Sequence, residues 1–159
     1  MKIRAKEPKD QCWIEQLLNE RWGGEGRVIV HGEIFDARAL PALVAGEQQG
    51  LATYQIRRVN DLTFAELIPL DALGAGQGVG TALIEELVSR LRAGGVNTLR
   101  VTTTNDNLDA LRFYQRRGFR IKAVRPGAVD ESRRIKPFIS PIGEYGIPIH
   151  DEIELERLV

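Results

Sequence analysis

Four glycines alternate along the chain where the backbone could come close to an anion. Gly74, Gly76, Gly78 and Gly80 follow an apparent strand and stand at the start of an amphipathic helical pattern. Glycine lets the backbone approach a ligand without a Cβ in the way, and the N–H groups of a first helical turn attract phosphate or pyrophosphate. The same glycines could serve only a tight turn or close helix packing. The turn alone therefore leaves anion binding and a structural role equally open.

The residues around this turn argue against two common nucleotide sites. A P-loop needs Lys and then Ser or Thr after its last glycine, whereas Thr81 follows Gly80 directly. The dinucleotide spacing G-x-G-x-x-G also fails, because its last glycine would fall on Val79 or Thr81. A kinase, an NTPase and an NAD-binding Rossmann site are therefore disfavoured.

A second motif follows the glycine turn and narrows the kind of ligand. Residues 107–119, NLDALRFYQRRGF, resemble the N-x-x-A-x-x-F-Y-x-x-x-G-F helix and turn of the GNAT acyltransferase superfamily. The turn itself resembles the pyrophosphate loop of that superfamily, written Q/R-x-x-G-x-G/A, with Gly78 and Gly80 at the glycine positions. Ala75 departs from the pattern, because it stands where Gln or Arg is usual. We therefore expect somewhat weaker cofactor binding at this turn.

The resemblance implies a fold and an activity. The fold is a single α/β (α+β) domain over residues 1–159, with a mixed, mostly antiparallel central sheet of about six or seven strands flanked by helices. The activity is that of an N-acetyltransferase, with acetyl-CoA as the cofactor. The acetyl group would pass to a primary amine of a small molecule, peptide or protein by direct attack in a ternary complex. A non-catalytic acyl-CoA-binding or regulatory domain is the alternative.

The resemblance also assigns residues to the cofactor. Backbone groups near Ile68 and Leu70 would pair with the amides of the pantetheine arm, although Pro69 between them has no N–H to donate. Either Asn105 or Asn107 would hydrogen-bond the same arm, and capping of the following helix explains both residues equally well. The pyrophosphate would lie on the backbone amides of five consecutive residues: Gln77, Gly78, Val79, Gly80 and Thr81.

Two side chains, Tyr114 and Glu66, are candidates for the chemistry. Acyl transfer from a thioester requires a neutral amine, stabilisation of charge on the carbonyl oxygen and a proton for the departing thiolate. Tyr114 resembles a tyrosine that lies near the coenzyme sulfur in related enzymes, and a phenol with a pKa of about 10 keeps its proton at neutral pH. A core tyrosine is the alternative. Glu66 resembles a glutamate that deprotonates the amine through water in some members, and a solvent-facing strand residue is the equally open alternative.

No motif selects the residues that would bind the acceptor amine. Trp22 is a candidate for one wall of the substrate cleft. The two histidines lack supporting ligands and predict no metal site. Six residues outside the motifs could reach a substrate: His31, Glu33, Glu144, Tyr145, His150 and Asp151. A basic cluster could meet the adenosine phosphate, an acidic substrate or only solvent: Arg133, Arg134 and Lys136.

The elements that must position these residues follow from periodicity. Apolar residues at helical spacing predict helices over residues 9–21 and 78–92, and a third helix runs from a cap at residues 105–107 to residue 117. Strands are predicted over residues 2–6, 27–31, 42–47, 51–58, 62–70, 98–103, 120–124 and 149–158. The segment 126–148 contains four prolines and is predicted to be an ordered loop.

Composition limits the remaining possibilities. Lys plus Arg and Asp plus Glu both number 22, so we expect neither nucleic acid nor a membrane as a partner. The lack of a long apolar stretch and of a signal peptide predicts a cytoplasmic protein. The single cysteine, Cys12, excludes an internal disulfide and is predicted to be buried. The strand near Ile153 and Leu155 could pair within the chain or across a dimer, and from the resemblance alone we expect a homodimer.

Overall fold

Two compact units make up the described chain. The computed structural model describes residues 1–74 and 76–159, so Ala75, the departure from the glycine-loop motif, lies outside the described residues. The first unit contains Met1–Val28, Phe35–Leu99 and Val159, and the second contains Ile29–Ile34 and Arg100–Leu158. Seven strands belong to the main sheet, four in the first unit and three mainly in the second.

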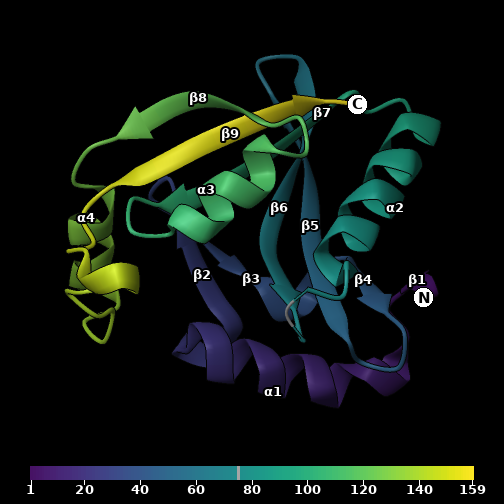
Figure 1. The fold of residues 1–159 in the computed structure, drawn as a ribbon, viewed down its shortest axis with the longest axis horizontal. Helices are drawn as coiled ribbons and strands as arrows, with labels where there is room; N and C mark the ends of the chain where they lie inside the picture. The colour runs from purple at the N-terminus through teal and green to yellow at the C-terminus, as the bar shows by residue number, and fades with distance from the viewer. Residues whose placement is uncertain (75) are drawn as a thin grey trace. The chain divides into compact units, whose positions relative to one another are not determined.

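Antiparallel strands dominate the first unit (Figure 1). They are β1 (Ile3–Ala5), β4 (Ala42–Ala45), β5 (Gly50–Val59) and β6 (Leu62–Ala72), in the order β1-β4-β5-β6 with every neighbouring pair antiparallel. A two-residue turn joins β5 to β6, with positive φ angles of 51° at Asn60 and 63° at Asp61. Such a turn matches the twist of the two long strands, which confirms the predicted hairpin.

Two α-helices belong to the first unit. α1 spans Gln11–Trp22 and α2 spans Val79–Ala93. α2 packs on β4, β5 and β6. A Cβ at Gly50 would clash with the side chain of Val79, so glycine is required where the strand and the helix touch. Short 3-10 helices shape the connections around α1: η1 (Pro8–Asp10), η2 (Gly24–Gly26) and η3 (Ala37–Ala39).

An ion pair fixes the turn that precedes α1. Arg4 of β1 donates two hydrogen bonds to the carboxylate of Asp10, at 2.7 and 2.9 Å, and the Glu7 N–H donates a third at 2.7 Å. The Arg4 hydrogen bonds lower the pKa of the buried Asp10 from its ordinary value of 3.8 to about 2. The carboxylate is therefore ionised at neutral pH and ties β1 to the start of α1.

Three strands and two helices form most of the second unit (Figure 1). The strands are β7 (Thr98–Thr104), β8 (Arg120–Arg125) and β9 (Glu152–Leu158), in the order β7-β9-β8, and the β8–β9 pair is antiparallel. α3 (Leu108–Gln115) follows β7, α4 (Ala128–Ile135) follows β8, and the 3-10 helix η4 (Glu144–Gly146) comes before β9. A separate two-stranded sheet consists of β2 (Arg27–Val30) and β3 (Glu33–Asp36), and its turn belongs to this unit.

The predicted fold class is confirmed, since the chain has a mixed α/β architecture with a seven-stranded, mostly antiparallel sheet and flanking helices. The segment 126–148, however, was wrongly predicted to be only a loop. It contains α4, which begins after Gly127 in the left-handed conformation and ends at Ile135, with Lys136 as its C-cap directly before Pro137. The helix has only eight residues and is flanked by prolines, which in a sequence are typical of a loop. Its helical pattern was therefore too short to be recognised.

One strand was not predicted, and one smaller prediction was wrong. Residues 33–36 form a strand, β3, that no apolar pattern indicated. His31 and Gly32 both adopt positive φ and reverse the chain between β2 and β3. Cys12 is exposed rather than buried. It lies in the first turn of α1 next to positions that face solvent, whereas the buried stripe of the helix begins at Ile14.

Candidate functional site

β6 carries a bulge in the segment predicted to meet a pantetheine arm. The register between β5 and β6 shifts so that Ile68 and Pro69 lie opposite the single residue Thr53, and pairing resumes at Leu70. A bulge leaves one residue out of the ladder and bends the strand. Pro69 cannot donate to a ladder in any case, so the irregularity costs the sheet little at this point. The strand is therefore shaped to offer backbone groups around Ile68 to something other than β5.

Glu66 lies on β6 two residues before this bulge, and only 1% of its surface is exposed. The Arg57 Nη1 atom is 3.5 Å from Glu66 Oε1. The Arg57 guanidinium itself lies over the rings of Phe35 and Phe64, at 5.5 and 5.9 Å. A cation this close offsets part of the cost of burying the carboxylate. The solvent-facing alternative for Glu66 is therefore excluded.

Two further polar atoms are buried beside Glu66. Gln55 is its partner on β5, and both Gln55 Oε1 and Thr53 Oγ1 are buried with no hydrogen-bond partner among the residues described. Paired residues and alternate residues of antiparallel strands share one face, so the three side chains lie on the same face of the sheet. Leaving such atoms unpaired is costly, which suits this face to a ligand with polar groups.

A second buried carboxylate lies at the end of β6. Asp71 accepts hydrogen bonds from the indole N–H of Trp22, which is 3.1 and 3.3 Å from its two oxygens. Burial raises the pKa of Asp71, and the Trp22 hydrogen bond and the charge of Arg21 counter this rise. Trp22, expected to form a wall of the cleft, thus anchors the last residue of α1 to β6. No sequence pattern predicted the contact, because its partners come from distant elements.

The glycine loop connects β6 to α2. Gly74, Gly76 and Gly78 have φ angles of 81°, 79° and 74°, a region that residues with a Cβ rarely adopt. A Cβ at Gly76 or Gly78 would meet no described atom within 4 Å, so the loop faces open space there. The Gln77 side chain turns back toward Gly74. The glycines are thus required by the backbone conformation, and the surface they leave is open to a ligand.

The first turn of α2 offers N–H groups to that open space. α2 has no side-chain cap and no acidic residue in its first turn. Its first helical hydrogen bond runs from the Ala82 N–H to the Gly78 carbonyl at 2.9 Å, so the N–H groups of Val79 and Gly80 come before it and have no partner within the helix. Thr81 is half-buried in the same turn. The positive end of the helix dipole is therefore available to an anion.

Tyr114 is held in a cluster of aromatic rings in the second unit. The residue is 7% exposed, and the rings of Phe113 and Phe119 pack edge-on against it at 5.2 Å each. Arg117 lies over the Phe113 ring at 3.8 Å and closes the cluster. This packing fixes the orientation of the phenol ring. Glu66, the other catalytic candidate, belongs to the first unit.

Asn105 and Asn107 make different contacts. The Asn105 side chain donates to the Pro148 carbonyl at 2.9 Å and accepts from the N–H groups of His150 and Asp151 at 2.9 and 3.0 Å. Asn107 caps α3, because its Oδ1 accepts from the Ala110 N–H at 3.1 Å. Asn105 thus holds the segment that leads into β9, a role that its position just before the motif did not reveal.

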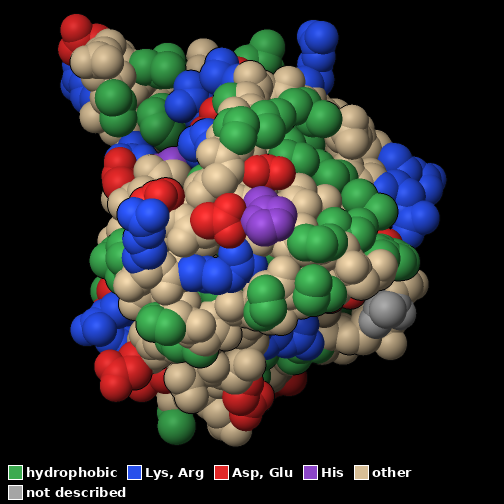
Figure 2. Space-filling model, turned by 90° about the vertical axis from the view of Figure 1, so that its left-hand side faces the viewer, with side chains coloured by type: hydrophobic (Ala, Val, Ile, Leu, Met, Phe, Trp, Pro, Cys, Tyr) green, Lys and Arg blue, Asp and Glu red, His purple; other side chains and the backbone are tan. Residues whose placement is uncertain are grey.

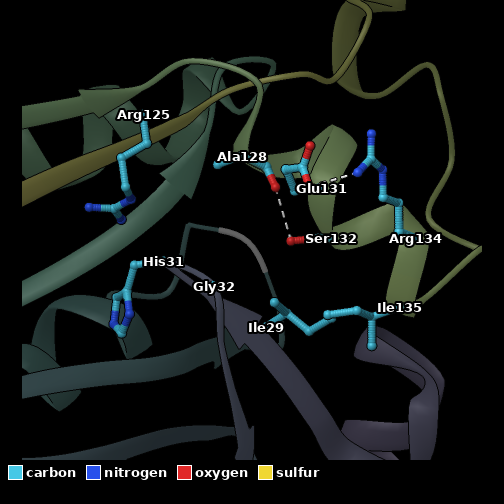
Figure 3. A pocket seen from close by; sticks show the side chains of 9 residues that line it. All are labelled: Ile29, His31, Gly32, Arg125, Ala128, Glu131, Ser132, Arg134 and Ile135. Carbon is cyan, nitrogen blue, oxygen red and sulfur yellow. Dashed lines mark hydrogen bonds and ion pairs between the residues drawn. The ribbon is translucent and has the colours of Figure 1, made fainter.

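A pocket of about 480 Å³ opens in the second unit (Figure 3). The β2–β3 turn, the end of β8 and α4 supply its walls. Ile29 and Ile135 approach each other on one side, and His31 and Arg125 lie on the other (Figure 3). The Arg134 guanidinium points to Glu131 (Figure 3). The sequence offered no pattern for this pocket, since two of its walls, the β2–β3 turn and α4, were not predicted.

A buried carboxylate holds the polar side of this pocket together. Glu152 accepts a hydrogen bond from Arg125 Nε at 3.0 Å and another from the His31 N–H at 3.0 Å. Arg125 also donates to Thr102 Oγ1 on β7 at 3.0 Å. His31 is held at a φ of 43°, unusual for a residue with a side chain. Of the six acceptor candidates named from sequence, His31 alone lines this pocket.

The charged residues around α4 are largely committed to local contacts. Arg133 donates to the Ile139, Ser140 and Ile149 carbonyls, Arg134 pairs with Glu131 at 3.3 Å, and His150 lies 3.0 Å from Asp130. Acidic and basic side chains are interspersed on the face seen in Figure 2, without a field of one sign. The predicted basic cluster is therefore not one surface patch.

The described part of the chain contains neither a group of candidate metal ligands nor a helix that could span a membrane. No group of three or more His, Cys, Asp or Glu residues there is placed to hold a metal ion. None of its helices is long and apolar enough to cross a bilayer.

Comparison with known proteins identifies relatives and a shared fold. Residues 50–119 match the acetyltransferase (GNAT) family. The chain is 36% identical over 150 residues to the uncharacterized protein YdhI of Bacillus subtilis (strain 168), covering 92% of this chain and 91% of YdhI. Its fold is similar to a GNAT family acetyltransferase from Elizabethkingia anophelis with acetyl-CoA bound (TM-score 0.66, 19% identity, 99% and 97% of the two chains). A Bacillus subtilis acetyltransferase in complex with CoA is also similar (TM-score 0.64, 18% identity, 99% of each chain).

Proposed function

Because the chain belongs to the GNAT family of acetyltransferases, we propose that it transfers an acetyl group from acetyl-CoA to a primary amine of a small molecule, peptide or protein. The amine nitrogen forms a bond to the acetyl carbonyl carbon while the carbon–sulfur bond breaks, which gives an amide and the free thiol of coenzyme A. We further propose that residues 1–159 act as a single catalytic domain.

The glycine loop is the observation that carries this proposal. Gly76 and Gly78 face open space in conformations that residues with a Cβ rarely adopt, and the uncapped first turn of α2 follows them directly. These features fit an anion of the size of pyrophosphate. Two solved acetyltransferases of similar fold hold acetyl-CoA or CoA, which supports the same ligand here. The backbone amides from Gln77 to Thr81 would hold the pyrophosphate, and those near Ile68 and Leu70 would pair with the pantetheine arm.

Two residues would move the protons of the reaction. Glu66, buried beside Arg57 and next to the bulge, would accept a proton from the amine through water, so that the nitrogen attacks as a neutral group. Tyr114, fixed by its aromatic neighbours, would give a proton to the departing thiolate. These two transfers balance, since one proton leaves the amine and one reaches the sulfur.

Of the two asparagines, we propose that Asn107 contacts the pantetheine arm. Asn105 uses both ends of its amide to hold residues 148, 150 and 151. Asn107 uses only Oδ1 for its helix cap, so its amide N–H₂ group can still donate to a carbonyl.

Calorimetric titration with acetyl-CoA, followed by a screen of amines for release of free thiol, tests the proposal. The screen covers polyamines, amino acids, aminoglycosides and peptide N-termini. Binding together with turnover of at least one amine is the expected result. Binding without turnover would favour the non-catalytic acyl-CoA-binding alternative, and no binding at millimolar acetyl-CoA would defeat both.

A further inference from the structure

The buried carboxylate of Asp71 lies at the end of β6, just before the glycine loop. We propose that Asp71 takes up a proton when the polyanionic cofactor binds to that loop. Protonation removes a negative charge beside the loop at the moment when the pyrophosphate brings more of the same sign. This inference rests on the proposed acetyl-CoA-dependent function and adds to it a proton that binds together with the cofactor.

The ionised form of Asp71 is costly in this position. The residue is 4% exposed, and burial raises the pKa of its carboxyl group above the ordinary value of 3.8. The Trp22 indole N–H donates to its oxygens, but among the residues described no lysine, arginine or histidine forms an ion pair with it. A buried charge with one neutral donor keeps much of its desolvation cost. Additional negative charge nearby therefore favours the neutral form.

The elements around Asp71 bring little charge of their own. On α1, the positive charge of Arg21 counters the rise in the pKa from a distance longer than an ion pair. The partner of Asp71 on β5 is Leu51, which is uncharged. Glu66, the other buried carboxylate of β6, lies further back along the strand and is paired with an arginine. The residues in the first turn of α2 are uncharged. An anion on the glycine loop is therefore a substantial change in the potential at Asp71.

The backbone of Asp71 lies next to the first residue of α2. A Cβ at Gly50 would be 2.5 Å from Val79 Cγ1 and 3.1 Å from the Asp71 carbonyl oxygen, so β5, β6 and α2 meet at this point. Val79 and Gly80 supply the N–H groups that come before the first helical hydrogen bond. A pyrophosphate on these groups would act on the buried carboxylate partly through the protein interior, where charges are screened weakly. Anion binding should therefore raise the pKa of Asp71 further.

The coupling between the proton and the cofactor is reciprocal. Because the bound anion favours neutral Asp71, neutral Asp71 favours the bound anion by the same factor. Cofactor affinity should thus fall as pH rises through the pKa of Asp71. The proton also affects α1, because an ionised carboxylate accepts the Trp22 hydrogen bond more strongly than a neutral one. Cofactor binding should therefore weaken the contact between the end of α1 and β6.

Calorimetric titration in buffers with different heats of ionisation measures the protons that are taken up on binding. The first probe is dephospho-coenzyme A, which keeps the pyrophosphate and lacks the phosphate monoester that itself titrates near about pH 6. Wild-type protein should take up a fraction of a proton that Asp71→Asn does not. At pH 8, Asp71→Asn should bind the probe at least about threefold more tightly than wild type, and the two affinities should converge as pH falls. Acetyl-CoA should give the same difference between the two proteins.

The variant and its control differ only in the group that titrates. Asp71→Asn keeps the side-chain volume and an oxygen that accepts from the Trp22 N–H. Asp36→Asn is the matched control, because Asp36 belongs to the same unit and its hydrogen bonds from Arg38 lower the pKa of its carboxyl group. Asp36 therefore stays ionised, and its replacement should leave the proton uptake and the affinity as in wild type.

The indole N–H resonances report the same proton by NMR. The chain has two tryptophans, so the Trp22 resonance can be followed with that of Trp13 as the internal reference. Binding should shift the Trp22 resonance more in wild type than in Asp71→Asn. Binding with equal proton uptake in both proteins, or with equal affinity at pH 8, overturns the inference and leaves the acetyltransferase proposal intact. Absence of acetyl-CoA binding at millimolar concentration overturns the proposed function, and this inference with it.

Discussion

Individual polar side chains on β5 and β6 decide what the first unit can do. Glu66 is buried next to Arg57, and the buried oxygens of Thr53 and Gln55 on the same face have no partner among the described residues. A protein interior rarely keeps such groups unless they serve a ligand or a reaction. This face of β6 is therefore where we place removal of the amine proton.

Replacement of Glu66 by glutamine tests that assignment. Glu66→Gln keeps the side-chain volume and removes the base, so kcat should fall about a hundredfold near neutral pH. The loss should shrink as pH rises, because the amine then loses its proton to solvent without help. A pH–rate profile measures this. A variant with wild-type kcat across the profile would show that another group is the base. Glu20→Gln, on the exposed surface of α1, is the control and should change nothing.

Tyr114→Phe tests the acid. Phenylalanine preserves the edge-on contacts with Phe113 and Phe119, so only the hydroxyl is lost. We expect kcat to fall about a hundredfold or more, with little change in acetyl-CoA affinity by calorimetry. Tyr145→Phe is the matched control, because that hydroxyl is exposed and bonds only Asp109 among the residues described. An unchanged kcat in Tyr114→Phe would remove the residue from this role.

At the scale of elements, the helices and strands with long, regular patterns were predictable. Apolar runs separated by a short polar turn located β5 and β6, and the glycines marked the start of α2. α4 was missed because proline and glycine flank it, and β3 because a turn at His31 and Gly32 has no strong apolar signal. These two gaps also left the pocket between the β2–β3 turn and α4 unpredicted.

The site residues also fall into those that could be predicted from the sequence and those that could not. Residues whose role follows from backbone chemistry, such as Gly78, could be named from local sequence, since positive φ and a helix start are local properties. Contacts between distant segments could not. The Trp22–Asp71 hydrogen bond and the Asn105 contacts with residues 148–151 depend on tertiary packing that no single stretch encodes. The glycine turn could therefore be predicted from the sequence, whereas the residues around the acceptor could not.

Gly78→Ala tests the loop as an element. Gly78 has a φ of 74°, so alanine should cost about 1 kcal/mol of stability and place a Cβ where the pyrophosphate would approach. Acetyl-CoA affinity, measured by calorimetry, should fall at least about tenfold. Gly95→Ala is the control at the other end of α2, with a φ of 79° and no described atom within 4 Å of its Cβ. It should lose similar stability and keep its affinity. Equal affinity losses in both variants would contradict the loop assignment.

The ion pair before α1 makes stability depend on pH. The pKa of Asp10 is lowered from 3.8 to about 2 by Arg4, so its contribution is present above about pH 4 and is lost as pH falls toward 2. Asp10→Asn should lower the free energy of unfolding at neutral pH by about 2 kcal/mol, and the difference from wild type should narrow below pH 4. Urea unfolding at several pH values measures both effects.

Asp36→Asn provides the comparison for Asp10. Asp36 makes the same two-point contact with Arg38, at 2.9 Å for both atoms, but its side chain is 43% exposed. Solvent weakens such a pair, so this substitution should cost less than about 1 kcal/mol. A loss as large as that of Asp10→Asn would show that burial is not what makes the Arg4–Asp10 pair strong.

At the scale of the whole molecule, the chain path links the two units covalently more than once. The second unit combines residues 29–34 with residues 100–158, and both β2 and β7 contribute residues to each unit. A strand that is shared in this way cannot unfold in one unit and stay ordered in the other without breaking its own pairing. The homodimer and the cytoplasmic location stay predictions.

Calorimetry should therefore show one unfolding transition. For 159 residues the enthalpy should be about 110 kcal/mol near 60 °C, and the calorimetric and van't Hoff values should agree. Acetyl-CoA should raise the temperature of the whole transition, because a ligand stabilises every part that unfolds together with its site. Gly95→Ala should lower the midpoint without changing this ligand-induced rise. Two resolved transitions, with only one moved by acetyl-CoA, would mean that residues 1–159 do not act as a single domain and that the bound unit folds on its own.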